Sequence, residues 1–343
     1  MAGPVSTTPQ KTPWARVAAT VALLTVIISV LLTAFAWPAA RSSLHDVPVV
    51  VAGPPGAADQ MVAALQQRMP DAFDITRVAD AAAAEEAVRD REAYGAIDLS
   101  AGPPRVIVAS AASPVVAQAL TAVAEAVRGD GGTPAAAVRD LAPLPADDPR
   151  GVGLAASALP LVIGGMLAAV LLTSRVRGTV RRLAGALAYS VTAGLAMAAI
   201  LQFWLGSLNG AYVANAGVIA LSVAATSTTI LGLEALFGTV GFGIGAAIMV
   251  LLGNTLSGAT SAPEMLPGWS GQFGQFLPPG AAGWLLRSTA FFDGHGAIRP
   301  ILVLTAWLLA GAILVVVGTR RAARRAVAAR PADEARTPVA AGA

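Results

Sequence analysis

Long apolar segments dominate the sequence and limit the folds that it can adopt. A membrane-spanning helix needs about 20 mostly apolar residues. Six stretches of the 343-residue chain fit this description: 17–37, 152–173, 183–205, 211–232, 236–255 and 301–318. Only 13% of the residues are charged, whereas about a quarter are charged in an ordinary soluble domain. The sequence therefore predicts an α-helical multi-pass membrane protein with six spans in a lipid bilayer.

Glu234 lies where the fourth and fifth predicted spans meet. A carboxylate at the centre of a bilayer costs ~2.5–3.5 kcal/mol. A tight turn at residues 233–237 would instead bring Glu234 to the membrane surface, which is the preferred interpretation. The alternative is a buried Glu234 that carries protons.

The placement of the arginines predicts the orientation of the spans. Four segments together hold 12 basic and 3 acidic residues. They are the N-terminal arm (1–16), the loop after the second span, the turn at Glu234 and the C-terminal tail (320–343). Cytoplasmic loops carry an excess of Lys and Arg, so we expect both termini to be cytoplasmic. The basic residues are 22 Arg and 1 Lys, and this bias, with abundant Ala and Gly, suggests a GC-rich bacterial genome and says nothing about nucleic acid. We expect a protein of the bacterial cell membrane with no nucleic-acid partner.

The loop after the second span is also a candidate docking surface for a partner protein. Its arginines are Arg175, Arg177, Arg181 and Arg182. The alternative is that they only set the topology.

Residues 17–37 could be an anchor helix or a cleaved signal peptide, because residues 34–36 resemble a signal-peptidase site. Their apolar run is longer than the roughly 7–15 residues of a signal peptide, which favours an uncleaved anchor helix.

Residues 38–151 have a different pattern and predict an extracytoplasmic α/β domain between spans 1 and 2. Short apolar runs bounded by Gly and Pro predict strands, and stretches with apolar residues at helical spacing predict helices. The expected order is β-α-β-α-β-β-α, with Asp80 capping the second helix and Ser113-Pro114 starting the third. The following residues, up to Arg150, look like a loose return to the membrane.

No motif for catalysis or for a cofactor is present. The only lysine, Lys11, follows Gln10 and not the glycine that a P-loop requires. The two histidines, His45 and His295, are far apart, and the chain has no cysteine. The sequence therefore predicts no enzyme, no cofactor and no metal site.

Residues 257–298 are too polar and too rich in proline to cross a bilayer, yet they contain many aromatic residues. We expect a re-entrant or interfacial hairpin at the outer face of the five-helix membrane domain (152–319), broken at Pro278. Its aromatic side chains would lie at the lipid headgroups: Trp269, Phe273, Phe276 and Trp284. Such a hairpin caps a translocation path, or it is an inert interfacial helix.

The order of segments along the chain resembles that of the type-2 ABC permease superfamily, in particular the phage infection protein family. This order is one anchor helix, an outer α/β domain and five further spans. The similarity is sharpest in residues 253–294, at Pro263, Leu266-Pro267, Leu277-Pro278 and Arg287. It implies an export subunit with the ATPase on a separate chain, working as a homodimer or a heterodimer. The family's outer region is far longer, which argues against a phage-receptor role. The alternative is an envelope scaffold or secretion accessory that binds a partner through the α/β domain.

Overall fold

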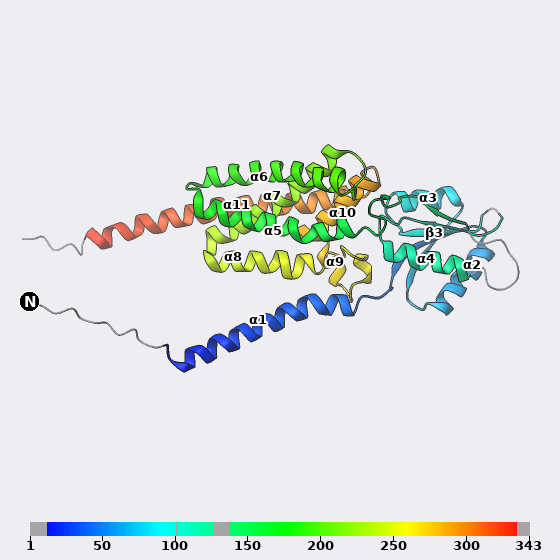
Figure 1. The fold of residues 1–343 in the computed structure, drawn as a ribbon, viewed down its shortest axis with the longest axis horizontal. Helices are drawn as coiled ribbons and strands as arrows, with labels where there is room; N and C mark the ends of the chain where they lie inside the picture. The colour runs from blue at the N-terminus through cyan, green and yellow to red at the C-terminus, as the bar shows by residue number, and fades with distance from the viewer. Residues whose placement is uncertain (1–11, 101, 127–136, 335–343) are drawn as a thin grey trace, which may run out of the picture.

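The computed structural model describes residues 12–100, 102–126 and 137–334, which form a helical bundle and an α/β domain placed end to end (Figure 1). Five helices in this part of the chain are long and apolar enough to cross a membrane. They are α1 (Trp14–Ala40), α5 (Val152–Arg175), α6 (Thr179–Ala199) with its π-helical extension η1 (Ile200–Trp204), α7 (Tyr212–Phe237) and α11 (Ile298–Glu334). This architecture is that of a multi-pass membrane protein.

The predicted fifth span is a shorter helix than expected. It consists of α8 (Thr239–Ala246), which continues as the π-helix η2 (Ala247–Asn254). At about 1.5 Å per residue its length is roughly 24 Å, less than the roughly 30 Å of a bilayer core. The turn before it lies at Gly238, with φ of 65°, so Glu234 belongs to the last turn of α7.

Helix α7 forms the centre of the bundle and is enclosed by α5, α6, α8, α10 and α11. In its most apolar stretch 78% of the residues are buried. Small residues allow the helices to approach closely. A Cβ at Gly311 of α11 would lie 2.5 Å from the amide nitrogen of Thr229. The Thr229 hydroxyl in turn donates a hydrogen bond of 3.3 Å to the carbonyl oxygen of Trp307.

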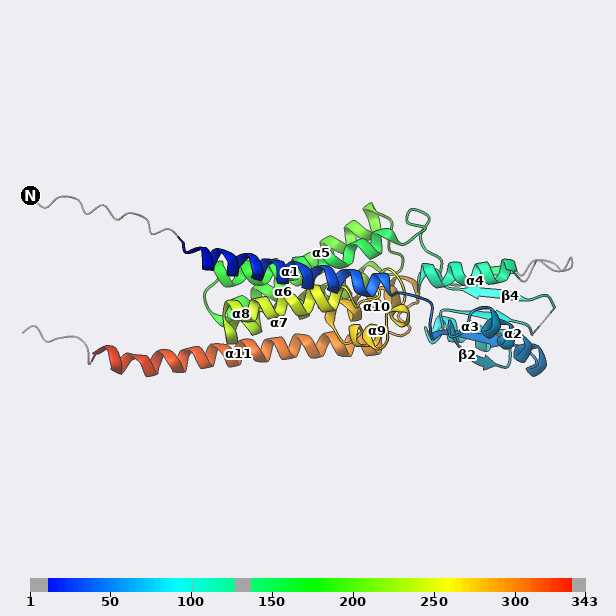
Figure 2. The same cartoon turned by 90° about the horizontal axis from the view of Figure 1, so that it is seen from below.

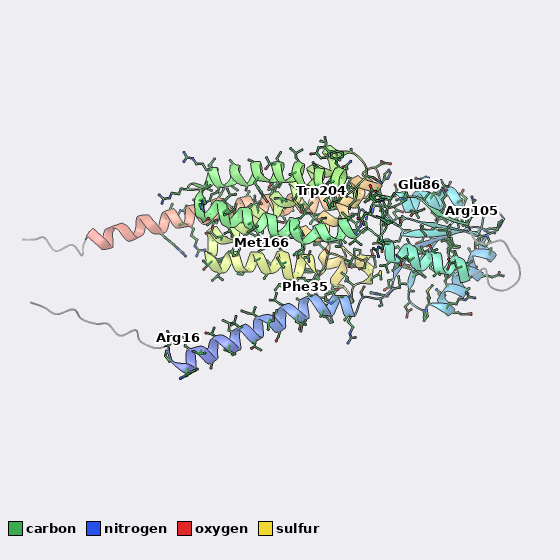
Figure 3. The ribbon with its side chains drawn as sticks, viewed as in Figure 1. Arg16, Phe35, Glu86, Arg105, Met166 and Trp204 are labelled. Atoms are coloured by element: carbon green, nitrogen blue, oxygen red, sulfur yellow. The ribbon has the colours of Figure 1, made fainter. Side chains whose placement is uncertain are left out.

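Helix α1 diverges from the other helices toward its N-terminus (Figure 1 and Figure 3) and lies across the near side of the bundle in Figure 2. Its main contact with the bundle is with η2, and none of the residues in its most apolar stretch is buried. The hydroxyl groups of Thr25, Ser29 and Thr33 donate to carbonyl oxygens four residues earlier in the same helix. The polar groups of α1 are therefore satisfied without a neighbouring helix.

The α/β domain follows α1 and contains a five-stranded sheet in the order β2-β1-β3-β4-β5. Strand β1 is parallel to β2 and β3, β3 is antiparallel to β4, and β4 is parallel to β5. Helices α2, α3 and α4 pack on this sheet. The elements are β1 (Val47–Ala52), α2 (Pro55–Arg68), β2 (Phe73–Val78), α3 (Ala81–Arg89), β3 (Gly95–Asp98), β4 (Arg105–Val108), α4 (Pro114–Ala126) and β5 (Ala137–Asp140).

The predicted order of strands and helices is confirmed as far as α4. Asp80 caps α3 by accepting a hydrogen bond of 2.9 Å from the amide of Ala83, and α4 begins at Pro114. The expectation of a loose return after α4 is wrong at residues 137–140, which form β5. All four side chains of β5 are exposed, so the strand lacks the apolar alternation that would have predicted it.

Candidate functional site

The α/β domain and the bundle meet at residues 257–298. This segment contains the one-turn helix η3 (Pro263–Met265), the short helix α9 (Ser270–Gly274) and the longer helix α10 (Pro278–Phe291). Met265 and Phe292 are buried in the same apolar cluster as the strands of the α/β domain. The junction is therefore a shared core and not a loose linker. We call this end of the bundle the domain end.

Arg91 is the main polar connection across the junction. It follows α3 in a left-handed conformation, with φ of 63°. Its guanidinium carbon lies 3.8 Å from the centroid of the Trp284 ring. Its Nη1 donates hydrogen bonds of 2.7 Å to the hydroxyl of Ser288 and 2.8 Å to the carbonyl oxygen of Trp284. A cation–π contact and two charge-assisted hydrogen bonds thus attach the α/β domain to α10.

A second polar contact lies beside Arg91. The hydroxyl of the buried Tyr94 donates a hydrogen bond of 2.8 Å to Oε2 of Glu264. Burial raises the pKa of Tyr94 well above its usual value, and the charge of Glu264 raises it further. Burial lowers the pKa of Arg91 to about 9, against the opposing effect of Tyr94. Both groups therefore keep their usual protonation states at neutral pH, with Arg91 cationic and Tyr94 a neutral donor.

A cavity of about 560 Å³ opens next to these residues. Ligand pockets in proteins usually have volumes of about 300–1,000 Å³. Its walls come from the α/β domain, the 257–298 segment and the start of α11. The side chains that can bind a ligand are Glu92, Glu264, Gln272, Gln275, Trp284 and Arg299. Charges of both signs, two amides and one aromatic ring fit a polar organic molecule, so this cavity is the candidate functional site.

The aromatic residues predicted to lie at lipid headgroups do not form one group. Trp269 and Phe276 are 72% and 53% exposed, and Phe273 packs edge-on against Trp269. Trp284 instead lies under the guanidinium of Arg91. The two prolines named in the sequence also differ, because Pro267 lies in the turn before α9, whereas Pro278 starts α10. The expected break at Pro278 is therefore the start of a helix.

The predicted docking arginines lie at the opposite end of the bundle, which we call the arginine end. The hydroxyls of Thr179 and Thr319 are 3.0 Å apart there, so the loop lies beside the basic stretch of α11. Three of the arginines are exposed: Arg175, Arg177 and Arg181. Arg182 turns inward and donates to the carbonyl oxygens of Thr173 and Val176 at the end of α5.

Glu234 is also at the arginine end, although the chain turns at Gly238 and the prediction of a turn at residues 233–237 is wrong, because α7 continues to Phe237. Its Oε2 lies 4.0 Å from Nη1 of Arg182 and accepts a hydrogen bond of 3.4 Å from the hydroxyl of Thr173. Glu234 therefore has a structural partner, and the structure gives no support to a proton-carrying role at mid-membrane.

Sequence reasoning missed Arg91, Tyr94 and Glu264, since no local motif marks them. Arg91 and Ser288 are 197 residues apart in the chain. In the described parts of the chain, no group of three or more His, Asp or Glu side chains could hold a metal ion. No protein-family model, curated protein or solved structure matches the chain. The geometry of the junction is therefore the basis for inferring its function.

Proposed function

We propose that the chain is the membrane subunit of a bacterial export system whose ATPase is a separate chain. The observation that carries this proposal is the ligand-sized cavity beside the Arg91–Trp284 contact. Helix α10 forms part of its wall and packs against α7 and α11. These two helices extend from the domain end to the arginine end (Figure 1). A rearrangement driven at the arginine end would therefore reach the cavity through continuous packed helices.

The bundle of one chain is packed around α7 and is not hollow, since most of α7 is buried. We therefore propose that a translocation path forms between two subunits, in a homodimer or a heterodimer. The exposed side chains of α1 are largely apolar. This surface is therefore free to contact a second subunit within the bilayer.

The proposed orientation places the arginine end in the cytoplasm and the α/β domain outside, with both termini inside and six crossings including α8–η2. It makes a direct prediction, because cysteine is absent from the sequence. Ser100→Cys should react with an impermeant maleimide on intact cells stripped of any outer barrier. Ser174→Cys should react only after the membrane is opened. Both native side chains are exposed, so protection of Ser100→Cys or labelling of Ser174→Cys in sealed cells would contradict the orientation.

Export by a separate ATPase predicts a docking site at the arginine end. The full chain, purified in mild detergent from its native cells, should carry a stoichiometric partner that hydrolyses ATP. Replacing Arg175, Arg177 and Arg181 together by alanine should lower the bound ATPase activity at least about tenfold, because three exposed charges that bind a partner are removed. Purified protein should be assayed for ATP hydrolysis, and the partner should be identified by mass spectrometry.

The matched control is alanine at Arg320, Arg321 and Arg324, which are also exposed arginines at this end. This variant loses the same charge and should keep the ATPase. Equal losses in both triple variants would show that net charge and not a docking site is responsible. A wild-type protein that functions in cells without any ATPase would overturn the export proposal.

A second candidate is an envelope scaffold, and β5 is the observation that favours it. This edge strand is exposed along its whole length, and an open strand edge can pair with a strand of another protein. A scaffold would function without ATP, whereas the export subunit would not. Depletion of cellular ATP while function is monitored therefore separates the two candidates.

A further inference from the structure

Arg287 on α10 is a buried charge with few partners. Its exposed fraction is 9%. Its Nη2 donates a hydrogen bond of 2.6 Å to the carbonyl oxygen of Ala259, but its buried Nε has no hydrogen-bond partner. Within residues 12–100, 102–126 and 137–334, no carboxylate forms an ion pair with it. Buried charges in proteins are normally paired, so Arg287 requires an explanation.

A cavity of about 200 Å³ lies beside Arg287, and its lining is positively charged. It is separate from the 560 Å³ cavity, and the two share no lining residue. Arg287 and Arg150 both line the smaller cavity, whereas none of its lining residues is acidic. Thr260 adds a hydroxyl group, and the other lining residues are apolar or glycine. Two guanidinium groups and a hydroxyl without a carboxylate form an environment suited to an anion.

The helices around this cavity add to its positive potential. Pro114 at the start of α4 and Val152 at the start of α5 both line it, and the N-terminal end of a helix carries a partial positive charge. The first amides of α5 are already bonded to Asp148, whose Oδ1 accepts from Val152 at 2.8 Å. Asp148 offsets part of the positive charge of α5, so the two arginines remain the main source of attraction.

We propose that this cavity binds a phosphate group, held between Arg287 on α10 and Arg150 before α5. The donors suit a tetrahedral anion with several acceptor oxygens better than a single carboxylate, because planar guanidinium groups can each give two hydrogen bonds. The phosphate would accept hydrogen bonds from the guanidinium of Arg287 and fasten α5 and α10 to each other. The group could belong to a lipid headgroup or to soluble phosphate, and the proposal is independent of the export function.

The cavity adjoins a small apolar pocket on the side of the bundle interior. A second pocket of about 30 Å³ shares Leu154, Ala259 and Arg287 with it. This smaller pocket is lined mainly by apolar residues of α5 and α10, including Leu161 and Leu286. A headgroup at Arg287 would therefore lie next to apolar helix surface.

The test measures binding to the delipidated full chain in neutral detergent, from the shift of its thermal unfolding midpoint. The probes are sodium phosphate, compared with sodium chloride at equal ionic strength, and phosphatidylglycerol, compared with diacylglycerol. A ligand that binds only the folded protein raises the midpoint, and the shift grows with the logarithm of the ligand concentration relative to the Kd. A shift with sodium phosphate would identify the phosphate group alone as sufficient, and a shift only with phosphatidylglycerol would identify a lipid site.

Substitutions locate the site. Arg150 is exposed, so Arg150→Gln should fold normally and weaken binding about tenfold, the loss expected for one charge-assisted hydrogen bond. Arg287→Gln should abolish binding. Arg299→Gln is the control, because Arg299 lines the other cavity, and it should bind like the wild type. The proposal is overturned if neither phosphate probe exceeds its comparison compound, or if Arg150→Gln binds as tightly as the wild type.

Discussion

Gly241→Ala should strongly destabilise the bundle, whereas Gly243→Ala, two residues away on α8, should not. A Cβ at Gly241 would lie 1.9 Å from the carbonyl oxygen of Leu233 on α7, but a Cβ at Gly243 would meet no atom within 4 Å. The oxygen belongs to rigid backbone, so α8 would have to move away from α7. Overpacking of this kind typically costs about 1–3 kcal/mol, and we expect the upper end of that range.

The pair controls for the intrinsic helix preference of alanine. Replacing glycine in a helix favours folding by up to about 1 kcal/mol, and this gain applies equally to both variants. The measurement is the thermal unfolding midpoint of the purified full chain. The midpoint should fall by several degrees for Gly241→Ala and remain equal or rise for Gly243→Ala. Equal shifts would show that α8 does not approach α7 as closely as the structure indicates.

Arg91→Ala should release the α/β domain from the bundle. It removes the contact with the Trp284 ring, which is worth about 0.5–2 kcal/mol, and two hydrogen bonds from a charged donor, which are worth about 1.5–3 kcal/mol each. Arg91→Lys should restore only part of this, because an ammonium group does not reproduce the planar fork of a guanidinium. In the proposed export system, export should be lost along with the docking.

Docking can be measured with cysteines at positions 90 and 295. The Asp90 and His295 side chains are 2.5 Å apart across the junction, and the chain has no other cysteine. With Asp90→Cys and His295→Cys present, a short bismaleimide should link the two positions efficiently unless Arg91 is replaced by alanine. Arg89→Ala is the control, since Arg89 forms an exposed pair with Glu85, which contributes little to stability. Unchanged crosslinking in Arg91→Ala would contradict the role assigned to Arg91.

The sequence predicted elements whose cause is local. Strands β1 to β4 and helices α2 to α4 follow from apolar periodicity and from bounding Gly and Pro residues, and the cap at Asp80 follows from the residue type at a helix start. The long apolar helices follow from length and composition. Strand β5 was missed because its four exposed residues carry no such periodicity, and pairing with β4 determines its conformation.

The candidate site could not be predicted in the same way. Its defining contact joins Arg91 to residues that lie almost 200 positions later, and neither partner belongs to a recognisable motif. Trp284 was predicted from its residue type to lie at lipid headgroups, but it instead packs against the guanidinium of Arg91 from the α/β domain. Arg287 was singled out only through a resemblance, and its significance lies in an unpartnered nitrogen that a sequence does not reveal.

The isolation of α1 has a consequence for how the protein is made. A segment that satisfies its own hydroxyls and has no buried residue in its most apolar stretch is stable in lipid by itself. It can leave the translocon as soon as it is synthesised. Helix α7 is less apolar and mostly enclosed by its neighbours, and one of them, α11, is synthesised last. We therefore expect α7 to remain near the insertion machinery until α11 has been synthesised. Helix α1 would insert first and by itself, and the bundle around α7 would assemble last.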